Sequence, residues 1–113
     1  MPQTLRATPA QFQPTPTGFY SYHTPDGLAT QYRLHLRVLP DETGILIVNA
    51  SSILRLNQTG TYFAWLKMQG KSENEIIDLS LKRYKVEEPL LKADLKRFDE
   101  EILSIVNNPD QAP

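Results

Sequence analysis

The sequence contains no cysteine, and this absence excludes several kinds of site. Without cysteine thiolates the chain can form no disulfide, no cysteine-ligated zinc site and no iron–sulfur cluster of its own. Histidine is scarce too: only His23 and His35 are present, and their spacing is not that of a metal-ligating pair. We therefore expect neither a metal centre nor a bound cofactor.

Long apolar runs and an excess of one charge are also missing. No segment approaches the roughly 20 apolar residues of a membrane span, and the N-terminus lacks the apolar core of a secretory signal. Twelve basic and 13 acidic residues leave a formal net charge of -1, so bulk charge points neither to nucleic acid nor to a membrane surface. We expect a cytoplasmic protein without membrane contact.

Patterns of catalytic residues are absent as well. The five glycines are dispersed singly, which excludes a loop that cradles phosphate. Ser51 and Ser52 lack the context of a catalytic nucleophile, and the acidic runs at residues 87–88 and 99–101 are typical of solvated helix faces. The sequence therefore predicts a chain without catalytic residues.

The 113 residues are enough for one ordinary domain. Four of the nine prolines fall within the first sixteen residues, and proline restricts the backbone to extended conformations. We predict a proline-rich arm over residues 1–17 and a folded domain over residues 18–106. Residues 107–113 are typical of a linker or tail, and another domain could follow them.

Strand patterns occupy the first half of this domain. The aromatic segment Gly18–His23 favours a strand, and a turn follows at residues 24–27. Residues 30–38 alternate between apolar and polar side chains, which predicts a half-buried strand in a hairpin with the first. The apolar run 45–48 is typical of a strand covered on both faces. Ser52–Leu56 is predicted as the third main strand.

Beyond this strand the apolar period changes to that of a helix. Asn57 and Thr59 are both able to cap a first helix, which Gly70 would end. Ser72 and Glu75 have the spacing of a capping box, in which each side chain bonds to the backbone of the other. This pair predicts the start of a second helix.

A third helix is predicted to begin near Pro89. Its apolar residues step by four and three positions, and we expect this stripe to face the core: Leu91, Leu95, Phe98, Ile102 and Ile105. Strands followed by three helices predict an α+β fold, with the helices on one side of a small antiparallel sheet. A compact three-helix unit beside strands also has the outline of a winged helix.

A winged helix suggests DNA binding through the third helix. Residues 87–101, however, carry three basic residues against six acidic ones, whereas phosphate contacts require positive charge. Nucleic acid is therefore not the expected partner, and a winged-helix domain that binds DNA or protein is the alternative interpretation. Arg33, Arg37 and Arg55 lie on strands, where they could form a small basic patch.

The first two strands contain an aromatic group formed by Phe19, Tyr20, Tyr22 and Tyr32. Such residues pack in a core or at an edge hairpin, or they form a surface for binding or dimerisation. The sequence leaves these alternatives open.

The strand before the helices offers a different mode of binding. An edge strand has unpaired N–H and C=O groups, which can accept an extended peptide as an additional strand. Ser52–Leu56 is the predicted edge because it is the last strand before the helices.

Four segments carry a resemblance to a known family. They are Leu54-Arg55-Leu56-Asn57, Gly70-x-Ser72-x-x-Glu75-Ile76, Tyr84-x-Val86 and Asp94-x-x-x-Phe98. In this order they resemble the PqqD family, which includes the RiPP recognition elements that serve in the synthesis of ribosomal peptide natural products. The resemblance extends over residues 45–105. Gln69-Gly70 stands where the family often has Asp-Gly, and the N-terminal strand and the arm are additional.

The resemblance implies a winged-helix-like domain of three strands and three helices. It implies antiparallel binding of a precursor's leader peptide between the third main strand and the third helix. The partner would be a radical SAM enzyme or another peptide-modifying enzyme, separate from this chain or fused to it. Because the chain lacks the cysteines for such an enzyme's cluster, it could supply only the recognition part. We expect recognition of a leader peptide in general, rather than synthesis of pyrroloquinoline quinone in particular.

The predicted peptide-binding residues follow from this arrangement. The strand would pair with the peptide and the third helix would form the opposite wall: Ser52, Ile53, Leu54, Arg55 and Leu56, with Leu90, Leu91, Asp94 and Arg97. Arg55, Lys92 and Arg97 could favour acidic positions of the peptide. The N-terminal arm could cover the edge, or it could exchange between protomers and give a homodimer.

Overall fold

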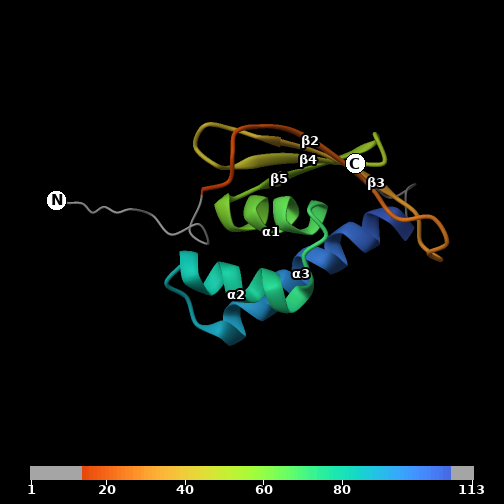
Figure 1. Ribbon diagram of the computed structural model, residues 1–113. Coiled ribbons are helices and arrows are strands. Elements are labelled where there is room, and N and C mark those ends of the chain that lie inside the picture. The colour runs from red at the N-terminus through yellow and green to blue at the C-terminus, as the bar shows by residue number, and fades with distance from the viewer. Residues whose placement is uncertain (1–13, 108–113) are drawn as a thin grey trace.

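The computed structural model of the chain describes residues 14–107. Four strands precede three helices, in the order β2, β3, β4, β5, α1, α2 and α3. The strands form one antiparallel sheet in the order β2-β3-β4-β5, and all three helices lie on the same side of it (Figure 1). The predicted α+β fold, with three main strands, an additional N-terminal strand and three helices, is confirmed.

β2 spans Gly18–His23 and forms the predicted hairpin with β3, which spans Arg33–Val38. β3 begins later than the predicted strand over residues 30–38. The Thr24 N–H donates to the Tyr32 carbonyl (3.1 Å), whereas the Tyr32 N–H donates to the Thr24 hydroxyl (3.1 Å). The Thr24 hydroxyl thus takes the place of a backbone carbonyl as the acceptor for the Tyr32 N–H. The regular pairing of β3 with β2 therefore starts after Tyr32.

β4 spans Gly44–Val48 and pairs on its far side with β5, which spans Ser52–Leu56. No described strand lies beyond β5, so the prediction that it is an edge strand is confirmed. The prediction that β4 is covered on both faces is wrong. Ile45 and Ile47 remain half-exposed, because the described helices cover only one side of the sheet.

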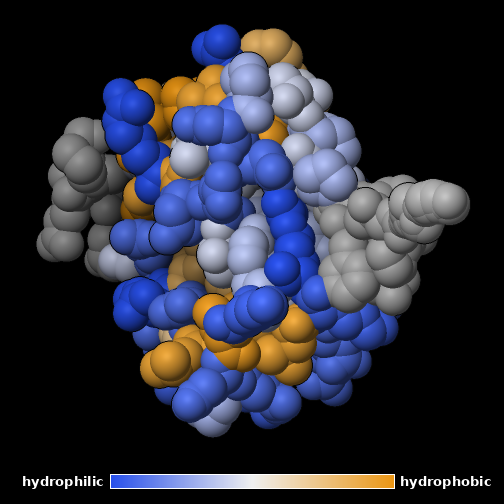
Figure 2. All heavy atoms as spheres, turned by 90° about the vertical axis from the view of Figure 1, so that its left-hand side faces the viewer, coloured by the Kyte–Doolittle hydropathy of each residue, from blue (hydrophilic) through white to orange (hydrophobic). Residues whose placement is uncertain are grey.

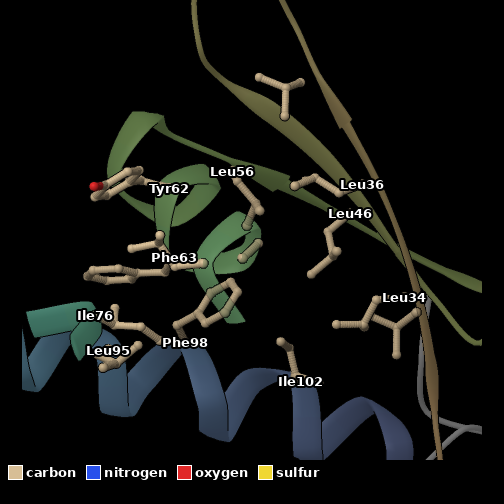
Figure 3. Packing of buried hydrophobic residues seen from close by; sticks show 14 of the residues in the cluster. Leu34, Leu36, Leu46, Leu56, Tyr62, Phe63, Ile76, Leu95, Phe98 and Ile102 are labelled. Atoms are coloured by element: carbon tan, nitrogen blue, oxygen red, sulfur yellow. The ribbon is translucent and has the colours of Figure 1, made fainter. Parts of the chain in front are cut away.

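The core lies between the sheet and the helices. Successive strand residues alternate between the two faces, and those of β3, β4 and β5 that face the helices include six nearly inaccessible side chains: Leu34, Leu36, Val38, Leu46, Val48 and Leu56. They pack with Phe63, Ile76 and Phe98 from the three helices (Figure 3). This close packing fixes α3 relative to the sheet.

α1 spans Gln58–Met68 and packs closely on the sheet. Of the two predicted caps Asn57 is used, since its side-chain oxygen accepts a hydrogen bond from the Gly60 N–H (2.8 Å). A Cβ atom at Gly44 would lie 2.7 Å from the Thr61 hydroxyl oxygen. Glycine at this position of β4 therefore permits the close approach of α1.

α2 spans Glu73–Arg83 and α3 spans Glu88–Asn107. The capping box is formed, with the Ser72 hydroxyl and the Glu75 carboxylate each accepting from the other's N–H. The predicted stripe of α3 is confirmed, with four members buried and the last half-buried: Leu91, Leu95, Phe98, Ile102 and Ile105. α3 includes the first residue of the predicted tail, and residues 108–113 lie outside the described residues.

Most of the predicted arm also falls outside the described residues, which begin at residue 14. Residues 14–17 form no helix or strand, although Thr15 is buried. Within residues 14–107, no helix combines the length and the apolar character needed to cross a membrane.

Candidate functional site

Two adjoining hollows separate β5 and the start of α1 from α3. The first is lined by residues of all three elements: Arg55, Leu56, Asn57, Thr59, Gly60, Phe63, Asp94, Arg97, Phe98 and Glu101. The second is lined by β5 and α3: Leu54, Arg97, Glu100, Glu101, Ser104 and Ile105. Because Arg97 and Glu101 border both hollows, the two form one groove, which we call the β5–α3 groove.

The hydrogen bonds of β4 show which way its backbone groups point. The Asn49 N–H donates to the Arg33 carbonyl (2.9 Å), so at this position the backbone faces β3. Backbone groups alternate in direction along an antiparallel strand, and those of Leu46 and Val48 therefore face β5. The Ser51 N–H, which donates to the Val48 carbonyl (3.2 Å), agrees with this direction.

The register then identifies the free backbone groups of β5. Ser52 and Leu54 are the partners of the β4 residues that face β5, so their N–H and C=O groups point inward. Ile53 and Arg55 alternate with them, and their N–H and C=O groups point away from the sheet at its open edge. Unpaired groups in this alternation are what an added strand requires.

The opposite wall is an exposed face of α3. Asp94, Arg97 and Glu101 follow one another at helical spacing, and all three line the first hollow. The Arg97 guanidinium donates to the Asp94 carboxylate (2.6 Å), and its side chain is 75% exposed. Leu90 is also exposed and lies one turn before Asp94, beyond the residues that line the hollows.

The floor of the first hollow is aromatic. Phe63 of α1 and Phe98 of α3 both line it, and their rings meet edge to face with centroids 6.2 Å apart. Both side chains belong to the buried core. The groove therefore rests on rigid packing between α1 and α3.

Charges of both signs border the groove. Two arginines, Arg55 and Arg97, and two carboxylates, Asp94 and Glu101, line the first hollow. The N-terminus of α1, whose first turn has no acidic residue, also lies there and favours negative groups. The carboxylates of Glu100 and Glu101 border the second hollow and favour positive groups. A ligand in the groove would meet both signs, and not only the positive charge expected from the sequence.

Leu91 and Lys92, like Leu90, are predicted residues of α3 that line neither hollow. Leu91 is 1% exposed and belongs to the inward stripe, so it supports the wall from within the core and does not line the groove. Lys92 forms an ion pair with Glu88 (2.8 Å) outside both hollows, and this hydrogen bond raises the pKa of Lys92. Ser52 is buried, and its backbone N–H and C=O groups point toward β4 and not toward the open edge.

The sequence-based prediction omitted several residues that line the groove. The sequence predicts a solvated face for Glu100 and Glu101. The seven-residue spacing between Asp94 and Glu101, however, puts these two residues on the same side of α3, where they line the groove. That spacing is a signal in the sequence. Thr59 and Gly60 carry no such signal, because their place in the groove depends on how α1 packs.

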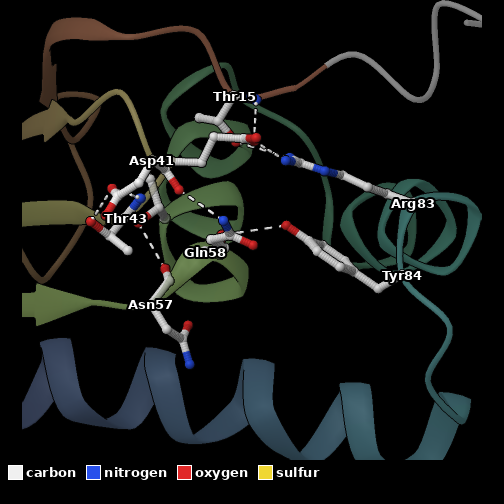
Figure 4. Close-up of polar contacts among 9 residues, drawn as sticks. Thr15, Asp41, Thr43, Asn57, Gln58, Arg83 and Tyr84 are labelled. Atoms are coloured by element: carbon white, nitrogen blue, oxygen red, sulfur yellow. Dashed lines mark hydrogen bonds and ion pairs between the residues drawn. The ribbon is translucent and has the colours of Figure 1, made fainter.

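A polar cluster holds the start of α1 beside the groove. The Gln58 side-chain amide donates to the Asp41 carbonyl (2.8 Å), and the Tyr84 hydroxyl donates to the Gln58 carbonyl (3.4 Å) (Figure 4). The Thr61 hydroxyl donates to the Asn57 carbonyl (2.8 Å). These bonds connect the β3–β4 turn, α1 and the end of α2.

Arg83 extends this cluster to the described end of the arm. Its guanidinium lies over the rings of Tyr62 (4.6 Å) and Tyr84 (5.0 Å), and it forms an ion pair with Glu42 and a hydrogen bond with the Thr15 hydroxyl (3.0 Å). Burial raises the pKa of both tyrosines.

The end of the molecule that faces left in Figure 1 is mainly hydrophilic, with hydrophobic patches above and below (Figure 2).

Neither described N-terminal segment covers the groove. β2 pairs with β3 at the edge of the sheet opposite β5. No residue from 14 to 17 lines either hollow. The β5 edge is therefore open in the described part of the chain.

The fold and the groove together define a class: a small α+β domain in which an open sheet edge faces a helix. The family model for coenzyme PQQ synthesis protein D (PqqD) matches residues 38–104. The match covers more than half of the chain, which belongs to the PqqD family, as the resemblance predicted. Searches of curated proteins and of solved structures each give no significant match.

Family membership gives the groove a context. PqqD domains are accessory, non-catalytic recognition proteins, and membership suggests a peptide-binding partner of a radical SAM enzyme. The matched residues contain β4, β5 and nearly all of α3, and therefore almost the whole groove. β2 and nearly all of β3 lie outside the match.

Proposed function

We propose that this chain is a non-catalytic recognition module that captures the leader of a precursor peptide and presents it to a peptide-modifying enzyme. The observation that carries the proposal is the open edge of β5, where the backbone groups of Ile53 and Arg55 face outward beside the α3 wall. In a member of the PqqD family, this edge and groove favour a peptide ligand.

The leader would pair antiparallel with β5. The outward N–H and C=O groups of Ile53 and Arg55 provide up to four hydrogen bonds with the peptide. At about 1 kcal/mol each, such bonds alone support only roughly millimolar affinity. Tighter binding therefore requires side chains of the leader to enter the groove, where each buried apolar side chain adds about 1.5–3 kcal/mol.

The lining of the groove suggests which side chains these are. An apolar residue of the leader would contact Leu54 and Ile105 in the second hollow, with Glu100 and Glu101 ready to pair with a neighbouring basic residue. An acidic residue would approach Arg97 and the start of α1 in the first. The same carboxylates make α3 unsuitable for phosphate contacts, which disfavours DNA binding.

Substitution of Ile53 by proline tests the pairing directly. Ile53→Pro removes an outward N–H, whereas the hydrogen bonds between β4 and β5 remain because they use its neighbours. We expect the affinity for the leader region of a candidate precursor to fall by roughly tenfold or more, measured by isothermal titration calorimetry. Ile53→Val, which keeps the N–H and most of the side chain, should bind within about twofold of the natural chain.

Two results would contradict the proposal. Unchanged affinity of both Ile53→Pro and Arg55→Pro would exclude pairing at this edge. Salt-sensitive binding of duplex DNA, with no response to any leader peptide, would favour the alternative of a DNA-binding winged helix over peptide recognition.

A further inference from the structure

The sheet face that points away from the helices has a charge pattern of its own. The four strands contain no Asp or Glu, and their arginines and histidines all belong to the alternate set that projects from this face: His23, Arg33, His35, Arg37 and Arg55. All five are exposed. In a chain with a net charge of -1, this outer face is a basic surface.

Apolar side chains lie between these arginines and histidines. Ile45 and Ile47 are half-exposed on β4, and Ile53, which pairs with Ile47 across the sheet, is 62% exposed. Phe19 is 79% exposed on β2, with the Arg37 guanidinium 5.4 Å from its ring centroid. No described helix covers this side (Figure 1). The outer face therefore combines an apolar centre with arginines and an exposed aromatic ring.

This composition is typical of a protein interface. Arginine and aromatic residues are enriched in such interfaces, and lysine and acidic residues are depleted. Nucleic-acid affinity depends instead on phosphate contacts from many Lys and Arg side chains, and the four strands offer three arginines and no lysine. A symmetric dimer through this face would bring two sets of arginines together with no strand carboxylate to pair with them, which disfavours a second copy of this chain.

Apart from Arg55, which also lines the first hollow, the outer face is separate from the groove proposed to bind the leader. Phe19, Arg33 and Arg37 lie outside the segment 38–104 that matches the family. The groove lies on the helix side of β5, whereas the side chains of Ile53 and Arg55 project to the outer face while their backbone groups point to the edge. A protein on the outer face would therefore lie beside a peptide bound at that edge.

We propose that the peptide-modifying enzyme binds to the outer face through a surface of its own that has an apolar centre surrounded by acidic residues. The identity of this partner rests on the proposed function. The acidic character of its surface is inferred from the arginines of the four strands and from the absence of carboxylates on those strands. Enzyme and leader then occupy different faces of one sheet, and a leader held at β5 emerges next to the docked enzyme.

The test uses the full chain and a purified radical SAM peptide-modifying enzyme from the same organism. Arg33→Glu/Arg37→Glu reverses two charges of the outer face and should weaken enzyme binding by roughly tenfold or more, measured by biolayer interferometry. Lys82→Glu/Lys85→Glu makes the same charge change at exposed positions on the helix side and should bind the enzyme like the natural chain. Phe19→Ala, which changes no charge, should also weaken binding.

Parallel titration with leader peptide separates this proposal from the proposed function. All these variants should bind the leader within about twofold of the natural chain, because none alters the groove. Failure of the natural chain to bind any leader overturns the proposed function, whereas the enzyme measurement still tests the outer face. Equal enzyme binding by all variants, no enzyme binding by the natural chain, or preferential binding of single-stranded RNA would overturn the docking proposal.

Discussion

Three residues other than glycine adopt positive φ within the described chain, and all lie in the turns on either side of β4. Glu42 (φ 70) is held there by its ion pair with Arg83 and by the Thr15 N–H, which donates to its carboxylate. Asn49 (φ 54) is a residue that tolerates this region, and its side chain accepts from the Arg33 N–H. Ala50 (φ 62) has no comparable compensation in its own side chain.

Ala50→Gly should therefore stabilise the fold. A left-handed backbone costs an alanine roughly 1–2 kcal/mol, and glycine loses somewhat more backbone entropy on folding, so we expect a net gain of about 1 kcal/mol in the free energy of unfolding. Urea denaturation measures it. Ala93→Gly, the same change on the exposed face of α3, should destabilise by about 1 kcal/mol. A loss of stability in Ala50→Gly would contradict backbone strain at Ala50.

Single residues differ in how far the sequence reveals them. Asn57 and the pair Ser72–Glu75 were predictable because a cap depends on neighbours within four positions. The cluster of Arg83 with Glu42 joins segments far apart in the chain, and no local pattern marks it. Leu91 shows a third case: its helical spacing correctly placed it in the core, while the resemblance placed it in the wall.

At the scale of elements, the alternation in β3 and the stripe of α3 were sufficient to predict which face each buries. The apolar run of β4 was not, because such a run does not tell whether a second layer exists. Only the arrangement of the helices shows that one face of β4 stays open. Which N–H groups of β5 are free likewise depends on strand order and register, which the sequence alone does not fix.

The capping box of α2 also makes stability depend on pH. Hydrogen bonding with the Ser72 backbone lowers the pKa of Glu75 in the folded chain, and the Thr43 hydroxyl does the same for Asp41. A lowered folded pKa contributes stability above the unfolded value, and this contribution is lost as pH falls through the folded pKa. Stability should therefore decline below about pH 4.5.

Glu75→Gln should make this decline shallower, because glutamine keeps a side-chain acceptor but does not titrate. Urea denaturation between neutral pH and about pH 3 measures the slope. Glu73→Gln, an exposed change in the same turn outside the box, should leave the slope nearly as it is. Equal slopes for Glu75→Gln and the natural chain would show that the box has no part in acid sensitivity.

At the scale of the whole molecule, the described residues present two proposed binding surfaces on one sheet. The groove follows the helix side of β5, and the basic outer face lies on the other side. Both depend on the same helix layer, which closes one face, builds the α3 wall and leaves the second face open. The sequence predicted the order of elements and a small basic patch of strand arginines, and the resemblance predicted the strand–helix groove. The register shows that these arginines share one face of the sheet with exposed apolar side chains.

The aromatic group of the first two strands shows the same dependence on the complete fold. Tyr20, Tyr22 and Tyr32 pack against the core as half-buried residues, whereas Phe19 projects from the outer face. Core packing therefore holds for the three tyrosines, whereas a role of Phe19 in binding stays a prediction. Dimer formation through the arm stays a prediction, since residues 1–13 lie outside the described part.

Amide hydrogen exchange in the presence of a leader peptide tests strand addition at β5 most directly. On saturation with the peptide, the exchange rates of the Ile53 and Arg55 amide protons should fall by roughly tenfold or more, because each becomes bonded to the peptide. Those of Leu54 and Leu56 should change little, since they already bond to β4. Bound peptide with unchanged exchange at Ile53 and Arg55 would contradict strand addition.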